Sequence, residues 1–196
     1  MDFLFDIGNV IVGVDFFPSL QRLIPAGTEN PETRLKQVIE RKDAFEAGNI
    51  EQAIYFPWVA QTLGYNGPLE KLIDAWLDIF TPNQPMWSCI EQLSQEGHRL
   101  ILFSNINNPH KEYLLENYPI FQHFTGGIFS YQTGYIKPES EIYQIAIKQY
   151  QLDPQNTAYI DDLPGNIQSG QHAGFQCHQY NTNQHDNFLK WLNQTL

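Results

Sequence analysis

Polar side chains that could serve as nucleophiles or metal ligands stand directly after three short apolar runs of this chain. Asp6 follows the first run, Ser104 the second, and the pair Asp161 and Asp162 the third. A carboxylate can attack an electrophile or coordinate a cation, and a hydroxyl can donate a hydrogen bond to an anion. The carboxyl ends of parallel strands meet at one edge of a sheet, where α/β folds bind their ligands. The spacing therefore predicts one polar cleft built from three strand ends.

The elements that must position these side chains alternate along the chain between short apolar strands and amphipathic helices. This alternation predicts an α/β fold with a parallel sheet. Met86, Ile90 and Leu93 share the inner face of one expected helix, which ends near Gly97. The expected strands cover residues 3–6, 100–104, 127–129, 158–161 and 175–180.

Residues 16–81 follow a different pattern, because they contain helical stretches and no convincing strand. After Pro68, apolar residues recur at helical spacing as far as Phe80. Pro57 should kink or break the preceding helix, because proline lacks the N–H that a helix interior needs. Thr81-Pro82 is interpreted as the hinge back to the sheet. The expected domains are an α/β core of residues 1–15 and 82–196 and a small all-helical cap of residues 16–81, inserted after the first strand.

Composition narrows the classes of partner and location. The 196 residues carry 11 basic and 22 acidic side chains, a net charge of -11, and contain no basic run. A nucleic-acid partner is therefore not expected. The two cysteines lack the spacing of a metal site, and a chain of this size with two lone thiols is typical of a reducing compartment. With no signal-peptide pattern and no apolar run of about 20 residues, we expect no membrane partner and a cytoplasmic location.

Four short motifs, in this order, resemble those of the haloacid dehalogenase superfamily of hydrolases. They are Phe-Asp-Ile-Gly-Asn-Val at 5–10, Phe-Ser-Asn at 103–105, Lys137-Pro138, and Asp161-Asp162 with Asn166. The resemblance covers the whole chain, including the helical insert. The opening is most similar to the bacterial sugar-phosphatase branch, which includes a glucose-1-phosphate phosphatase. The resemblance implies a Rossmann-like core with a helical cap after the first strand, and phosphatase activity.

The resemblance also implies roles for four of these residues. Asp6 would attack phosphorus and carry an aspartyl-phosphate intermediate, which splits one difficult displacement into two easier ones. The hydroxyl of Ser104 and the backbone amide of Asn105 would bind the phosphoryl oxygens. Lys137 would bind the substrate phosphoryl group, neutralise its developing charge and keep Asp6 ionised. The expected substrate is a small phosphomonoester, with hexose phosphates preferred over nucleotides.

Asp6, Asp161 and Asp162 cannot share one cleft without compensation, because neighbouring carboxylates repel one another. A divalent cation resolves the repulsion, and oxygen ligands suit Mg²⁺. The resemblance implies that the backbone carbonyl of Gly8 is a further ligand and that Asp162 reaches the metal directly, with Asp161 coordinating or supporting. Asn166 would orient these ligands from outside the coordination sphere.

Gly8 is the main departure from the family pattern. Most phosphatases of the family carry an Asp at this position, which protonates the leaving group and then activates water. A glycine cannot do this, a loss of about 10²–10⁴ in rate. Asp15, Asp43 and Glu46 border or occupy the insert and could replace the missing group, and the sequence does not decide among them.

The glycine leaves two alternatives to the phosphatase. One is a metal-independent 2-haloacid dehalogenase, against which the paired Asp161 and Asp162 argue, because they indicate magnesium. The other is a weakly active or inactive domain that binds a phosphorylated ligand. Magnesium-dependent hydrolysis of an aryl phosphate separates the phosphatase from both.

Overall fold

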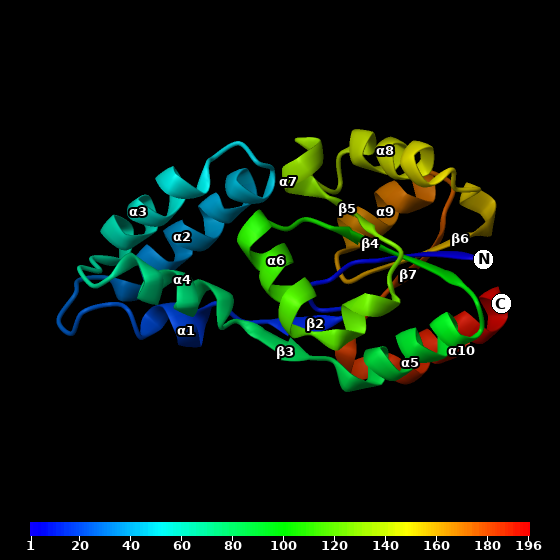
Figure 1. Ribbon diagram of the computed structural model, residues 1–196, viewed down its shortest axis with the longest axis horizontal. Coiled ribbons are helices and arrows are strands. Elements are labelled where there is room, and N and C mark those ends of the chain that lie inside the picture. The colour runs from blue at the N-terminus through cyan, green and yellow to red at the C-terminus, as the bar shows by residue number, and fades with distance from the viewer.

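Five parallel strands form the central sheet of the computed structural model, which describes residues 1–196 (Figure 1). They lie in the order β5-β4-β1-β6-β7. Phe5, at the end of β1, lies beside Leu102 of β4 and Ile160 of β6, so the strands finish at one edge. The strands are β1 (Asp2–Phe5), β4 (Arg99–Ser104), β5 (Gly127–Phe129), β6 (Thr157–Asp161) and β7 (Gln176–Gln179).

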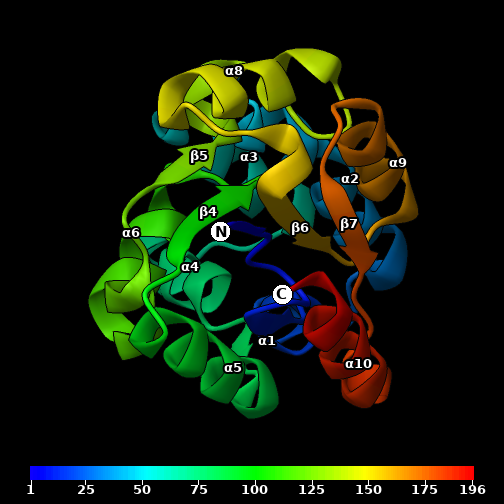
Figure 2. The same ribbon diagram turned by 90° about the vertical axis from the view of Figure 1, so that its right-hand side faces the viewer.

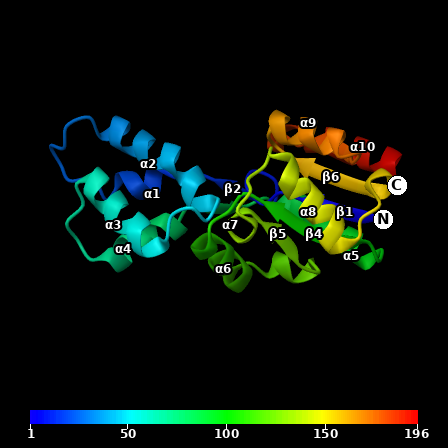
Figure 3. The same ribbon diagram turned by 90° about the horizontal axis from the view of Figure 1, so that it is seen from above.

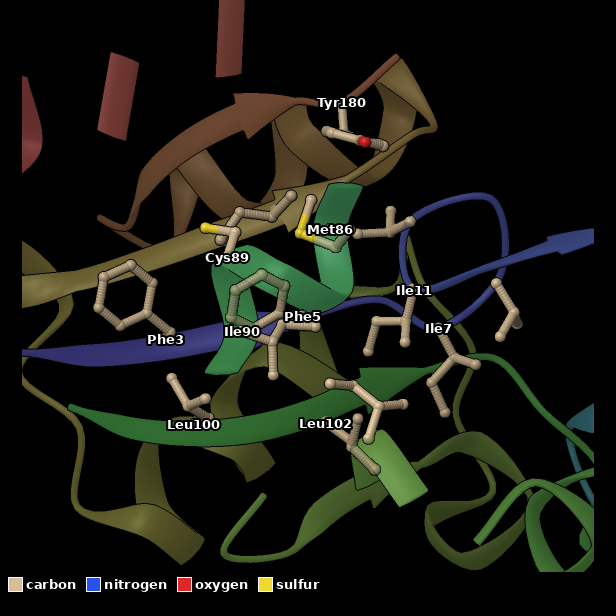
Figure 4. Close-up of a cluster of buried hydrophobic side chains, with 14 of the residues drawn as sticks. Phe3, Phe5, Ile7, Ile11, Met86, Cys89, Ile90, Leu100, Leu102 and Tyr180 are labelled. Carbon is tan, nitrogen blue, oxygen red and sulfur yellow. The ribbon is translucent and has the colours of Figure 1, made fainter. Parts of the chain in front are cut away.

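Side chains of successive strand residues point to opposite faces of the sheet, and each face has its own hydrophobic core. Phe3 and Phe5 pack with residues of α5 and α10 on one face, whereas Leu4 packs with residues of α8 and α9 on the other. Figure 2 shows these pairs of helices on opposite sides of the sheet. Figure 4 shows Phe3 and Phe5 against Met86 and Ile90 of α5. The flanking helices are α5 (Gln84–Gln95), α6 (Asn108–Asn117), α8 (Ser140–Tyr150), α9 (Pro164–His172) and α10 (His185–Thr195). The predicted fold class is confirmed.

Four helices form a separate unit at one end of the molecule, which we call the helical insert (Figures 1 and 3). Its own hydrophobic cluster centres on Trp76, Tyr55 and Phe56, which are fully buried or nearly so. Burial of these large aromatic side chains packs the four helices against one another. The helices are α1 (Phe17–Gln21), α2 (Pro31–Glu46), α3 (Gln52–Leu63) and α4 (Leu69–Leu77).

Two short antiparallel strands, which the sequence did not indicate, join the helical insert to the sheet. They are β2 (Val12–Val14) and β3 (Phe80–Pro82). Thr81-Pro82, expected to be a hinge, lies within β3, and α4 ends at Leu77 rather than continuing to Phe80. The remaining short elements are α7 (Ser130–Thr133) and the 3₁₀ helices Pro119–His123, Pro154–Asn156 and Thr182–Gln184.

Of the two effects expected of Pro57, a kink or a break, the break does not occur, because α3 runs through this residue. Tyr55, Phe56, Val59 and Leu63 of α3 are buried in the cluster of the helical insert. Their packing outweighs the one hydrogen bond that proline removes. No helix of the chain is long and apolar enough to cross a membrane.

Candidate active site

A cleft of about 670 Å³ lies between the carboxyl ends of the strands and the helical insert. Seven residues were predicted to bind the substrate or the metal, and six of them line this cleft. Asn166, predicted to orient the metal ligands, lines the cleft as well. Asp161 alone lies outside it, completely buried behind the others. The predicted residues in the lining are Asp6, Gly8, Ser104, Asn105, Lys137 and Asp162.

Lys137 is the central cation of this cleft. Its Nζ donates to Asp6 Oδ1 at 2.9 Å, to Asp161 Oδ2 at 2.6 Å and to the Phe103 carbonyl at 2.7 Å. Burial alone would lower the pKa of Lys137, but the carboxylates of Asp161 and Asp6 outweigh it and raise that pKa above its ordinary value. The ammonium therefore stays charged, with every N–H directed to an oxygen.

Asn105 holds the backbone of Lys137 in place. Its Oδ1 accepts from the Lys137 N–H at 2.7 Å, and its Nδ2 donates to the Lys137 carbonyl at 2.9 Å. The sequence indicated only the backbone amide of Asn105, so this use of its side chain was missed. Ser104, immediately before it at the end of β4, is buried and lines the same cleft. The two hydrogen bonds between Asn105 and Lys137 attach the loop after α7 to the end of β4.

Asp6, Asp161 and Asp162 offer carboxylate oxygens that all lie within 4.8 Å of one another. Burial, opposed by Lys137 and reinforced by the other two carboxylates, raises the pKa of Asp6 to about 6. Burial also raises the pKa of Asp162. Three carboxyl groups this close together, two of them with raised pKa values, fit a divalent cation of the magnesium type.

Asp161 and Asp162 have different surroundings despite being adjacent. Asp161 accepts from Lys137, from Tyr159 Oη at 2.6 Å, from the Leu163 N–H at 2.9 Å and from Asn166 Nδ2 at 3.0 Å. Burial raises its pKa, but Lys137 and these hydrogen bonds outweigh it, so the pKa is lowered.

Asp162 has far fewer partners and faces the cleft. Its carboxylate accepts one side-chain hydrogen bond, from Asn9 Nδ2 at 3.1 Å. The free oxygen lone pairs of the cluster are therefore on Asp162 and Asp6, whereas those of Asp161 are engaged by protein donors. Asn166 donates to Asp161 alone, so any effect it has on a cation passes through that residue.

Gly8 lies in the loop between Asp6 and β2. Its carbonyl accepts no hydrogen bond from the chain, and the residue lines the cleft beside Asp6. Its φ is outside the left-handed region, and a Cβ there would meet only Val14 Cγ2, at 3.4 Å. The position could therefore carry a side chain, and its missing carboxylate is not a steric necessity.

Three charged residues of the helical insert line the cleft, namely Lys42, Asp43 and Glu46 of α2. Lys42 Nζ donates to Glu46 Oε2 at 2.9 Å and to Asp43 Oδ1 at 3.1 Å. Sequence reasoning missed Lys42, although a Lys and a Glu four residues apart on a helix are a recognisable pair. His110 of α6 also lines the cleft, but it is a structural residue. Its ring stacks on Trp76, its Nε2 lies 2.9 Å from the Trp76 carbonyl, and burial lowers its pKa to about 3.

The rest of the cleft wall is largely apolar and comes from both sides of the junction. These apolar side chains come from the helical insert, from β2 and β3, and from loops of the core. They are Ile7, Val14, Phe16, Ile39, Ile79, Phe80, Ile106, Ile136 and Leu163.

The model of one protein family, the haloacid dehalogenase-like hydrolases, matches residues 3–174. The chain belongs to this family of hydrolases. The predicted family and the predicted enzyme class, a hydrolase, are thereby confirmed. Within the family, the chain is 27% identical to the D-ribitol-5-phosphate phosphatase of Bacteroides thetaiotaomicron over 188 residues, which cover 90% of this chain and 89% of that one.

Solved structures of the family have the same fold as this haloacid dehalogenase-like hydrolase. An enzyme from Bacteroides thetaiotaomicron, solved with magnesium and inorganic phosphate, superimposes with a TM-score of 0.79 at 22% identity, covering 93% of this chain and 95% of that chain. The L-2-haloacid dehalogenase of Xanthobacter autotrophicus superimposes with a TM-score of 0.66 at 15% identity, covering 90% of this chain and 75% of that chain. At these identities the likeness concerns the fold.

Proposed function

We propose that this hydrolase is a magnesium-dependent phosphatase that cleaves a small phosphomonoester through an aspartyl-phosphate intermediate. The observation that carries the proposal is the placement of Lys137 between Asp6 and Asp161, with Asp162 within 4.8 Å of both carboxylates. A nucleophile, a fixed cation and a set of oxygen ligands thus share one strand edge. These are the parts that phosphoryl transfer requires, since it depends on positioning and charge neutralisation.

In the first step, Asp6 attacks phosphorus and the bond from phosphorus to the leaving oxygen breaks. Lys137, held by Asn105, neutralises negative charge on the phosphoryl oxygens, and the buried Ser104 hydroxyl donates to one of them. In the second step, water attacks phosphorus and Asp6 leaves as a carboxylate. Lys137 favours ionised Asp6 in both steps, because it is the partner that opposes the upward shift of its pKa.

The residues that would hold the metal are Asp6, Asp162 and the carbonyl of Gly8, with Asp161 supporting them through Lys137 and Asn166. Bound Mg²⁺ supplies charge neutralisation and orientation of the phosphoryl group. The fit rests on the donor set, in which carboxylate oxygens crowd together and the Gly8 carbonyl has no partner within the chain.

The proposed substrate is a sugar phosphate or sugar-alcohol phosphate. The cleft of about 670 Å³ suits a small ligand. The similar phosphatase of Bacteroides thetaiotaomicron bears the name of a five-carbon sugar-alcohol phosphate. We also propose that residues 16–81 act as a cap domain over a core of residues 1–15 and 82–196, and so contact the part of the substrate beyond the phosphate. The cytoplasmic location stays a prediction.

The experiment is a panel of phosphate esters, with released phosphate measured with magnesium and with excess chelator. We expect magnesium-dependent release, with pentitol and hexose phosphates ahead of nucleotides. A clear preference for nucleotides would contradict the substrate class, and no release from any ester would contradict the phosphatase. Chloride release from a 2-haloacid without metal would instead indicate a dehalogenase.

A further inference from the structure

The proposed phosphatase needs a group that moves protons, and Gly8 cannot be that group. Three carboxylates border or occupy the helical insert. Asp15 is exposed, does not line the cleft, and its Oδ1 accepts from the Phe17 N–H at 3.0 Å at the start of α1. Asp43 lines the cleft, but its side chain is 65% exposed to solvent. Glu46 also lines the cleft and is only 6% exposed.

The carboxyl group of Glu46 is held at one oxygen and open at the other. Oε2 accepts from Lys42 Nζ at 2.9 Å. Oε1 has no hydrogen-bond partner in the chain. It is not fully buried either, so it keeps some access to solvent. Since the residue is otherwise enclosed and lines the cleft, that access is through the cleft. A substrate oxygen or a water molecule there can reach Oε1.

The end of α2 that carries Glu46 is attached to the core. Ser130 Oγ, at the start of α7, donates to the Glu46 carbonyl. Two residues later, Gly48 adopts a φ of 74°, and a Cβ there would lie 2.6 Å from the Tyr131 carbonyl oxygen. Both contacts place the last turn of α2 directly against the core, so Glu46 is positioned relative to Asp6 and not only relative to its own helix.

The charges around Glu46 suit proton transfer near neutral pH. Burial raises its pKa to about 7, with Lys42 opposing and Asp43 and Asp6 adding to the rise. The C-terminal end of a helix also disfavours a negative charge. Of the other ionisable groups nearby, Tyr55 of α3 has its pKa raised by burial and by Glu46, and His110 of α6, close to Lys42, is neutral. A group with a pKa close to the operating pH is an effective acid and an effective base.

We propose that Glu46 is the acid and base of this enzyme and replaces the carboxylate that Gly8 lacks. As Asp6 attacks phosphorus and the ester bond breaks, the proton of Glu46 passes to the leaving oxygen and releases an alcohol. Glu46, now ionised, removes a proton from the water that attacks the aspartyl-phosphate. Inorganic phosphate leaves, Asp6 is again a carboxylate, and Glu46 is again protonated. The inference rests on the proposed phosphatase activity.

The test compares Glu46→Gln with the wild type and with Glu40→Gln, which removes one charge from the same helix at an exposed residue that does not line the cleft. Each protein, with magnesium, is given an alkyl phosphate and p-nitrophenyl phosphate in steady-state and rapid-mixing experiments. We expect Glu46→Gln to lower kcat for the alkyl phosphate by about 10²–10⁴-fold. With the aryl phosphate, whose leaving group needs no proton, it should release about one nitrophenolate per enzyme in a burst and then turn over slowly. Glu40→Gln should resemble the wild type and show no burst.

Three results would overturn the proposal. Glu46→Gln could keep the wild-type kcat on the alkyl phosphate, or it could lose activity equally on both substrates without a burst, which would indicate a role in binding or folding. A wild-type protein that releases no phosphate with magnesium would overturn the proposed function, and this inference with it. An active wild type with an unchanged variant would overturn the role of Glu46 alone.

Discussion

Replacing Glu46 with glutamine should change the stability of the protein in a way that depends on pH. The folded pKa of Glu46 is raised by burial from the usual 4.5 to about 7, so the folded protein binds this proton more tightly than the unfolded chain does. Stability from this group is therefore present below about pH 4.5 and is lost as the pH rises toward 7. Glutamine is nearly isosteric, stays neutral and can keep a hydrogen bond with the Lys42 side chain only through its own oxygen. The stabilising effect of the substitution should consequently grow with pH.

The magnitude follows from the size of the shift. A difference of about 2.5 pKa units corresponds to about 3 kcal/mol at a pH above both values, and to about 1 kcal/mol at pH 5. Between about pH 5 and pH 8.5, the free energy of unfolding of Glu46→Gln should rise relative to wild type by about 2 kcal/mol. Any pH-independent cost of the substitution cancels in this comparison.

Urea unfolding at the two pH values, with chelator present so that bound metal adds no stability, measures the effect. Asp43→Asn is the control, because its side chain is largely exposed and should change the free energy of unfolding by less than about 0.5 kcal/mol at either pH. If the free energy of unfolding of Glu46→Gln differed from that of wild type by the same amount at both pH values, the reasoning would be refuted. That result would mean that burial does not shift the pKa of Glu46.

Three further substitutions test the rest of the site. Asp6→Asn should abolish phosphate release without lowering the melting temperature in chelator, because the ionised carboxylate is already disfavoured there; retained activity would assign the nucleophile elsewhere. Lys137→Met should abolish activity and lower the free energy of unfolding by about 3–5 kcal/mol in urea, because Asp6 and Asp161 lose their cation; an unchanged midpoint would contradict the ion-pair argument. Gly8→Asp, added to Glu46→Gln, should restore part of kcat on an alkyl phosphate, whereas Gly8→Asn should not. The backbone φ at position 8 and the space beside Val14 admit both side chains, but only the carboxyl group of aspartate can give and take a proton.

The sheet and its polar edge could be predicted because their signals are local. An apolar run such as the one before Asp6 or Asp161 indicates a buried strand wherever it occurs, and parallel strands bring their ends together. The continuation of α3 through Pro57 could not be predicted, for the opposite reason. The effect of this proline on the helix depended on burial of Tyr55 and Phe56 in a cluster assembled from four helices, which no local window contains.

The part of the site in the helical insert could not be predicted in the same way. Lys42 and Glu46 are visible as a helical pair, but so is the exposed pair Lys36 and Glu40, which lies on the same helix. What distinguishes them is which side of α2 faces the core. That orientation comes from contacts between residues far apart in the chain, such as Ser130 with Glu46. The sequence therefore left Asp15, Asp43 and Glu46 open.

The pairing of β2 with β3 brings the entry and exit of the helical insert side by side, with Val12 opposite Pro82. A segment whose two ends are adjacent can be exchanged for another without disturbing the domain that hosts it. Evolution could in this way give one sheet many substrate ranges by exchanging caps. Because the proton-transfer group proposed above, Glu46, lies on α2, we expect exchange of the helical insert to remove chemistry as well as specificity. We therefore expect a chimaera with a foreign insert to need an aspartate at position 8 for activity.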